Sequence, residues 1–168
     1  WNGNINLCAA GGGCANTGEI QGVSHHEFGH GIQDNLIGGQ GSEGLGEGNS
    51  DIIANYMTRE SMIGRGFQNC TVGIRDSDNN LQYPDDLTGS IHFNGQIIAG
   101  FNWDNWKLFE NQYGETMGTL MAANRWHFAR KLWPSQVQNQ PGQVLQTFMA
   151  DDLPVNGGDG DLDNGSPN

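Results

Sequence analysis

The sequence predicts a mainly α-helical fold, α+β overall, with a short N-terminal piece that is β or irregular. Apolar residues recur at helical spacing in five segments, most of them bounded by a capping residue, a glycine or a proline. The alternation typical of a strand is present only weakly, in residues 4–7. At 168 residues, with five Trp and seven Phe to fill a core, residues 1–168 are expected to form a single domain.

The local signals place the helices in order. Thr17 can cap the first helix, and Gly38 and Gly39 end it. Pro134 closes the fourth helix, and the fifth follows Pro141. The acidic run at 75–80 is predicted to be a solvated turn rather than a cation site. The helices are expected at residues 17–37, 47–61, 94–113, 115–133 and 142–152.

Composition excludes some partners. The net charge of −12 argues against nucleic acid and against an anionic membrane surface, and it is compatible with an extracellular protein that binds cations. No stretch approaches the ~20 apolar residues that span a bilayer. The three cysteines, Cys8, Cys14 and Cys70, leave at least one unpaired within the chain. Both Cys8–Cys14 and Cys14–Cys70 remain open as disulfides.

An H-E-x-x-H motif at residues 26–30 lies inside the first predicted helix. Four residues of α-helix turn through about 400°, so His26 and His30 project from one face and can hold one Zn²⁺. Glu27 lies beside the metal without ligating it, where its carboxylate can act as general base toward a water. His25 offers a competing pair with His30, but five residues apart the two side chains diverge around the helix.

A third protein ligand is expected from the second helix. Glu47 is the best candidate, because it begins that helix and Asp51 follows one turn later on the same face. A carboxylate at Asp51 can accept a hydrogen bond from a zinc-binding histidine and fix its tautomer. Glu43 is the alternative third ligand, ranked second because it precedes the helix and lacks an Asp four residues later.

The runs HEFGHGIQDNLIGG and LGEGNSDI resemble the catalytic core of the gluzincin metallopeptidases, which are thermolysin-like enzymes, and most closely that of secreted fungalysin-like peptidases. The run YPDDLTGSIHFNGQIIAGFNWD is similar to a third block of the fungalysin-like enzymes. The resemblance covers roughly residues 10–168. It implies zinc ligands at His26, His30 and Glu47, a supporting carboxylate at Asp51, and a transition-state-stabilising histidine at His92.

The resemblance also implies a fold and an activity. The fold would be zincin-type, corresponding to the helical C-terminal half of a thermolysin-like catalytic domain. The activity would be that of a secreted, monomeric zinc endopeptidase acting on protein or peptide substrates. Two features depart from the family. No Tyr lies between His30 and Glu47, and only 25 residues precede His26, so the substrate-pairing edge strand is expected to be residues 4–7 or to lie upstream in a longer precursor.

Asp85 and Asp86 lie six or seven residues before His92. A carboxylate at this distance can fold back and pair with the imidazole, holding it charged and suited to stabilising an oxyanion. We therefore expect Asp86 to support His92.

The C-terminal tail carries alternate acids, as calcium loops do. Asn164 stands where an EF-hand-like loop has glycine, and the glutamate at the twelfth loop position is missing. Similar stretches also close the catalytic region of fungalysin-like peptidases, so a Ca²⁺ site stays open here beside a simple domain end. Its ligands would be Asp159, Asp161 and Asp163.

Two other functions are compatible with a zinc site. One is a catalytically silent zinc-binding module of a larger extracellular protein, against which the intact Glu27 argues, because a non-enzyme has no need of a general base. The other is a zinc aminopeptidase, which the E-x-x-S-D block and the acidic, Gly-rich composition fit poorly.

Overall fold

The structure, a computed structural model, describes residues 3–11, 15–68, 71–132 and 138–152. Within them the fold is mainly α-helical, as the sequence predicts. A two-stranded antiparallel sheet pairs Met62 with Asp76 and Ile63 with Arg75. The helices are α1 (Gln21–Ile37), α2 (Leu45–Thr58), α3 (Ile91–Tyr113), α4 (Glu115–Lys131) and α5 (Gln140–Asp151), and the strands are β1 (Met62–Ile63) and β2 (Arg75–Asp76).

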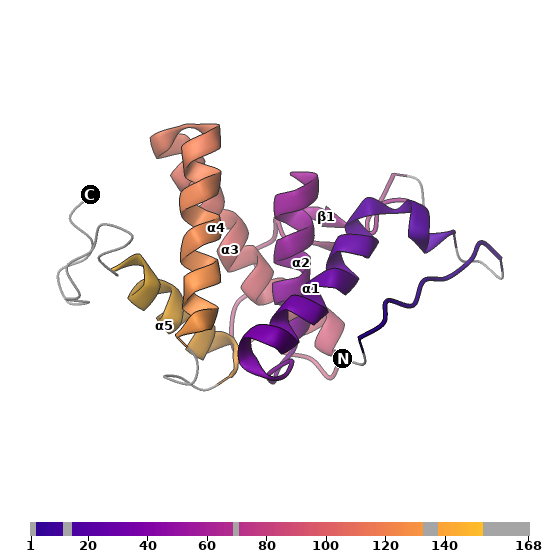
Figure 1. Cartoon of the computed structure of the whole chain (residues 1–168), viewed down its shortest axis with the longest axis horizontal. Helices are drawn as coiled ribbons and strands as arrows, with labels where there is room; N and C mark the ends of the chain where they lie inside the picture. Colours follow the sequence, from indigo (N-terminus) through magenta and orange to yellow (C-terminus); the bar gives the residue numbers. More distant parts are fainter. Residues whose placement is uncertain (1–2, 12–14, 69–70, 133–137, 153–168) are drawn as a thin grey trace.

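The helices pack mainly in chain order. The most extensive contacts between helices join consecutive helices, so the row runs from α1 to α5 across the molecule (Figure 1). Short connections favour this arrangement, because consecutive helices joined by few residues become spatial neighbours. The β1–β2 hairpin lies beside α2 and α3. Within the described ranges, no helix is both long enough and apolar enough to cross a membrane.

Glycines allow the three helices around the site to approach closely. A Cβ at Gly29 of α1 would lie 2.7 Å from the Cα of Ser50 in α2. A Cβ at Gly48 of α2 would lie 2.2 Å from a methyl group of Ile98 in α3, and one at Gly95 would lie 2.7 Å from the backbone of Gly48. Any side chain there would push the helices apart. These glycines therefore fix the distance between α1, α2 and α3.

The apolar core lies between α2, α3 and α4. Ile52, Ile53, Ala99 and Trp126 form one buried cluster, with Ile52 only 1% exposed. The Trp126 indole N–H donates to Asn49 Oδ1 at 2.8 Å, so the buried ring also has a polar partner. Ile52 and Ile53 lie little more than one turn after Glu47 on α2, so this cluster packs the helix that carries Glu47 against α3 and α4.

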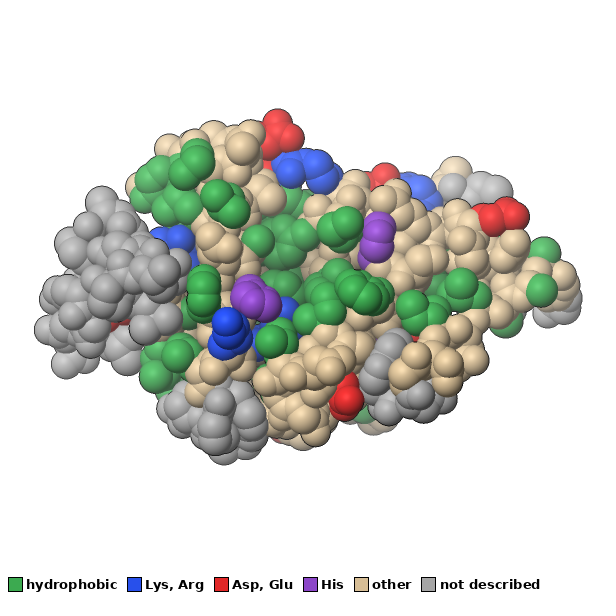
Figure 2. Space-filling model, in the orientation of Figure 1, with side chains coloured by type: hydrophobic (Ala, Val, Ile, Leu, Met, Phe, Trp, Pro, Cys, Tyr) green, Lys and Arg blue, Asp and Glu red, His purple; other side chains and the backbone are tan. Residues whose placement is uncertain are grey.

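An apolar cavity of about 510 Å³ opens where α1, α2 and α4 meet. In the view of Figure 2, apolar side chains gather over the middle of the molecule. Phe28 and Met57 line the cavity and are 55% and 57% exposed.

The N-terminal segment differs from the prediction. Residues 4–7 form no strand, and Ile5 and Leu7 are each 42% exposed, so their weak alternation buries no apolar face. Thr17 does not cap α1. It lies in a 3₁₀ turn (Thr17–Glu19), where its N–H donates to Cys8 O at 2.9 Å and its hydroxyl accepts from Cys8 N–H at 2.7 Å.

The boundaries of α2 and α3 also differ from the prediction. Helix α2 begins at Leu45 and ends before Arg59, whose left-handed φ of 61° stops the helix. Helix α3 begins at Ile91, because the Ser90 side chain accepts a hydrogen bond from Phe93 N–H and caps it. His92 is therefore a first-turn residue of α3 rather than a residue of the preceding loop.

Candidate metal centre

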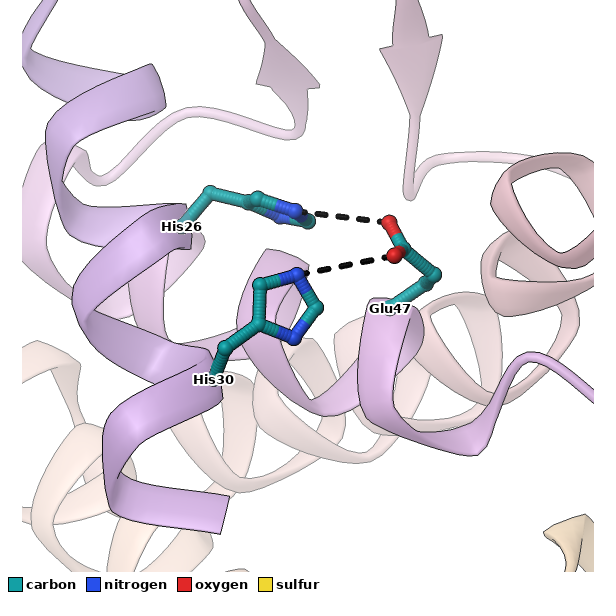
Figure 3. Close-up of side chains that lie close together, drawn as sticks. All are labelled: His26, His30 and Glu47. Carbon is teal, nitrogen blue, oxygen red and sulfur yellow. Dashed lines mark ion pairs between the residues drawn. The ribbon is translucent and has the colours of Figure 1, made fainter. Parts of the chain in front are cut away.

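Three side chains from α1 and α2 converge on one point. His26 and His30 project from one face of α1 toward Glu47 in the first turn of α2 (Figure 3). His26 Nε2 lies 3.4 Å from Glu47 Oε2, and His30 Nε2 lies 3.5 Å from Glu47 Oε1. One potential ligand atom from each residue lies within 4.8 Å of the other two. This group can hold a metal ion.

The other nitrogen of each imidazole has its own hydrogen-bond partner. His26 Nδ1 lies 2.6 Å from Asp51 Oδ1, and His30 Nδ1 lies 2.9 Å from Gln40 Oε1. The amide of Gln40 is held by its own Nε2, which donates to His30 O at 3.0 Å. Because a carboxylate and an amide oxygen only accept, both Nδ1 atoms carry the proton. Each Nε2 therefore faces the centre, and in the neutral imidazole it is the nitrogen that carries the lone pair.

Asp51 is the buried anchor of this site. It is 1% exposed, and Arg75 on β2 binds it through two hydrogen bonds, Nε to Oδ2 at 2.7 Å and Nη2 to Oδ1 at 2.8 Å. Burial raises the pKa of Asp51, but the hydrogen bonds with His26 and Arg75 outweigh it and lower the pKa below its usual value. Asp51 is therefore ionised when it supports His26.

The two carboxylates favour positive charge at the centre. Burial lowers the pKa of His26, yet hydrogen bonds to Asp51 and Glu47 raise it to about 9. Burial likewise raises the pKa of Glu47, while its contacts with His26 and the charges of His30 and His92 lower it. A site that favours an imidazolium so strongly is also suited to a bound cation.

His92 flanks the same centre, and Glu27 follows His26 in the chain. Glu27 is half-buried and lies on α1. His92 lies on the first turn of α3, where its Nε2 is 3.7 Å from Glu47 Oε1 and its side chain is 64% exposed. A group that approaches the centre from solvent would thus meet the His92 imidazole.

The structure does not show the expected support of His92 by Asp86. Asp86 Oδ2 instead accepts from Gln82 N–H at 2.7 Å, and the Asp86 N–H donates to Gln82 O at 2.9 Å. In the described ranges neither Asp85 nor Asp86 bonds to His92. The turn that these residues close uses the Asp86 carboxylate locally, while His92 points toward Glu47.

The alternative ligands lie elsewhere. Glu43 takes a left-handed φ of 57°, and its carboxylate accepts from the Tyr83 hydroxyl at 3.3 Å. His25 lines the apolar cavity between α1, α2 and α4. Neither belongs to the metal-binding group found among the described residues.

Other predictions concern the acidic segments and the cysteines. The predicted turn at 75–80 is wrong for Arg75 and Asp76, which form β2, because they pair with β1. After them, Asp76 Oδ1 accepts from Asp78 N–H at 3.0 Å, which is turn geometry. Cys8 is exposed and free. The remaining residues lie outside the part of the chain that is described: Cys14, Cys70 and the calcium candidates Asp159, Asp161 and Asp163.

No sequence motif predicts that Arg75 and Gln40 belong to the site. Arg75 sits in a run that predicts only a turn, and its partner Asp51 lies 24 residues earlier. Gln40 follows the glycines that end α1. Its polar side chain at this position is the one feature of the sequence that suggests a contact with the helix.

Neither the known protein-family models nor the curated proteins include a match to this chain. The chemistry of the site therefore rests on its geometry.

Proposed function

We propose that the protein is a zinc-dependent endopeptidase that hydrolyses peptide bonds of protein or peptide substrates outside the cell. The observation that carries the proposal is the convergence of His26 Nε2, His30 Nε2 and the Glu47 carboxylate, with Glu27 beside them in the chain. Two imidazoles and one carboxylate make up the ligand set of catalytic zinc sites, which keep a further position for water or substrate.

The observed spacing suits zinc. Bonds of about 2.0–2.2 Å at tetrahedral angles separate neighbouring ligand atoms by about 3.3–3.6 Å. His26 Nε2 lies 3.4 Å from Glu47 Oε2, and His30 Nε2 lies 3.5 Å from Glu47 Oε1. Asp51 and Gln40 hold the Nδ1 atoms, so both Nε2 atoms face the centre. Zinc would displace any proton on Nε2 and draw together ligand atoms that lie within 4.8 Å of one another.

The chain's own residues would divide the chemistry among them. Bound zinc would supply a Lewis acid that polarises the scissile carbonyl and makes a water more acidic. Glu27 would take the proton from the attacking water and pass it to the leaving nitrogen. His92, whose side chain is 64% exposed and therefore accessible to a substrate, would donate a hydrogen bond to the developing oxyanion. Asp51 and Gln40 would hold the two imidazoles in place.

The Glu27→Gln variant tests the proposal, because it keeps the side chain's shape and removes the base. We expect about one zinc per chain, as in the wild type, and hydrolysis of a quenched peptide blocked at both ends to fall by at least about 10²–10⁴-fold. Glu19→Gln on the exposed 3₁₀ turn is the matched control and should leave both unchanged.

Three outcomes would contradict it. If Glu27→Gln keeps more than a few per cent of the activity, Glu27 is not the base. A wild-type chain that binds zinc but cleaves nothing would be a silent zinc module. Cleavage limited to peptides with a free N-terminus would indicate an aminopeptidase.

A further inference from the structure

A second cavity lies apart from the metal centre, between α3, α5 and the loop at residues 79–83. Its volume is about 660 Å³, within the range of sites that bind small molecules or peptide side chains. The wall is largely apolar, with Ile97 and Phe101 from α3 and Val144 and Phe148 from α5. None of the three metal-binding side chains lines it.

Gln140 provides a buried polar group in this wall. It is 2% exposed, and its Nε2 donates to Glu43 O at 2.6 Å and to Asn94 O at 2.9 Å. Two carbonyl acceptors fix the orientation of the amide, so the other end is Oε1. Oε1 is buried and meets no donor within the described residues. It is thus a buried acceptor whose hydrogen-bonding capacity is not used within the described residues.

The charge around the cavity has one sign. Asp104 on α3 contributes an exposed carboxylate, and no Lys, Arg or His is among the described residues that line the cavity. Lys107, the nearest lysine along α3, has other partners. Its Nζ lies 2.9 Å from Glu110 Oε2 and 4.4 Å from the centroid of the Trp103 ring. In a chain of net charge −12, this rim favours a cation.

The mouth of the cavity exposes large apolar side chains. Phe148 is 54% exposed and Leu145 is 41% exposed. The Phe148 ring meets Phe101 edge to face, with centroids 6.2 Å apart. Exposed apolar side chains around a hollow with a few polar groups are typical of a surface that binds another molecule.

We propose that this cavity binds a peptide segment in which an aromatic or branched apolar side chain stands next to a lysine or arginine. The apolar side chain fills the space between Phe101, Val144 and Phe148. The adjacent cation pairs with the exposed carboxylate of Asp104. Binding does not need the metal, because the cavity and the metal centre share no residue.

The site is also connected to the metal centre through the backbone. Gln140 holds the carbonyl of Glu43, just before α2, and that of Asn94, in the first turn of α3. These helices carry Glu47 and His92. Gln140 therefore links the wall of the cavity to the two helix starts that carry those side chains.

The test is binding of a fluorescent, end-blocked peptide with the core Gly-Phe-Lys-Gly to the full chain, with Gly-Phe-Glu-Gly as the comparison peptide. Both are titrated by fluorescence anisotropy with the metal chelated, so that cleavage cannot interfere. We expect saturable binding of the lysine peptide and binding of the glutamate peptide weaker by about fivefold or more. Failure of the proposed peptidase activity would leave this result unchanged.

Variants locate the binding. Phe148→Ala should weaken the lysine peptide about tenfold, and Asp104→Asn should weaken it about threefold while abolishing the preference over the glutamate peptide. The controls are Leu108→Ala, an exposed apolar residue of α3, and Asp85→Asn, an exposed acid, neither of which lines the cavity. Circular dichroism confirms that each variant is folded.

Several results would overturn the proposal. These are the absence of saturable binding up to about 1 mM, equal binding of both peptides, and equal losses in the control variants. Binding of phenethylamine, but of neither peptide, would make the cavity a site for small amines instead. Self-association in sedimentation that Phe148→Ala abolishes would show that a second copy covers this face.

Discussion

Replacing Asp51 with asparagine removes the negative charge that supports His26 and keeps the shape of the side chain. Asp51 is 1% exposed and the side chain of Arg75 is 9% exposed, so both partners of this doubly hydrogen-bonded pair are buried. Asp51→Asn leaves the Arg75 cation without its counter-charge. Breaking a buried pair on one side costs about 3–5 kcal/mol, out of a total stability of about 5–15 kcal/mol. The melting temperature of the metal-free chain should fall by roughly 6–20 °C.

The same substitution should weaken the metal site. The His26 imidazole keeps a neutral acceptor at Nδ1 but loses the carboxylate that increases its basicity. Removing such a partner lowers metal affinity by about 10–100-fold. Zinc affinity is measured by competition with a chromophoric chelator, and stability by urea unfolding of the metal-free chain. Asp78→Asn, an exposed acid after β2, is the matched control.

A double-mutant cycle separates the buried pair from other effects. Adding Arg75→Met to Asp51→Asn removes the unpaired cation, so the double variant should be more stable than the sum of the two single losses predicts, by at least about 1 kcal/mol. Additive losses would show that the two residues are not coupled. A loss below about 1 kcal/mol for Asp51→Asn, with unchanged zinc affinity, would refute this account of the site.

Three further changes test other parts of the structure. His92→Ala should lower kcat by about 10²–10³-fold with little change in KM or zinc content, and loss of zinc would instead make it a ligand. Glu47→Gln should abolish stoichiometric zinc binding in metal analysis, whereas Glu43→Gln should keep it, and the reverse result would exchange the third ligand. Burial raises the pKa of Glu110, but hydrogen bonds from Lys107 and its other partners lower it from 4.5 to about 2. Its stabilisation is therefore complete above pH 4.5 and is lost as the pH falls through about 2. Glu110→Gln should be less stable than the wild type by about 1 kcal/mol at pH 7, as measured by urea unfolding, and most of this difference should be gone at pH 2. A difference in the free energy of unfolding that is undiminished at pH 2 would count against the ion pair.

Local periodicity explains what the sequence predicts well. The mainly α-helical fold follows from apolar spacing and end signals, which act within a few residues. The same period places His26 beside His30, and Glu47 one turn before Asp51, whatever the rest of the chain does. Gly29 is a further case, because a glycine inside a helix suggests a close contact, and here the contact is with Ser50.

Tertiary packing decided the features that join distant segments. The distance between α1 and α2 depends on the close contact of Gly29 with Ser50. Arg75 binds Asp51, and Gln40 binds His30. Both contacts depend on the paths of loops, which no local sequence pattern encodes.

Two predictions from the sequence are wrong, one for the side chain of Asp86 and one for residues 4–7. Asp86 was expected beside His92, but a turn hydrogen bond to Gln82 is closer and needs less ordering of the chain. Residues 4–7 carry the alternation of a strand, yet a strand also needs a partner and a buried face, and Ile5 and Leu7 remain exposed. A helix satisfies its own backbone hydrogen bonds, so its sequence largely determines it. A strand, a buried ion pair or a metal centre is completed by groups far along the chain, so only the packed structure determines it.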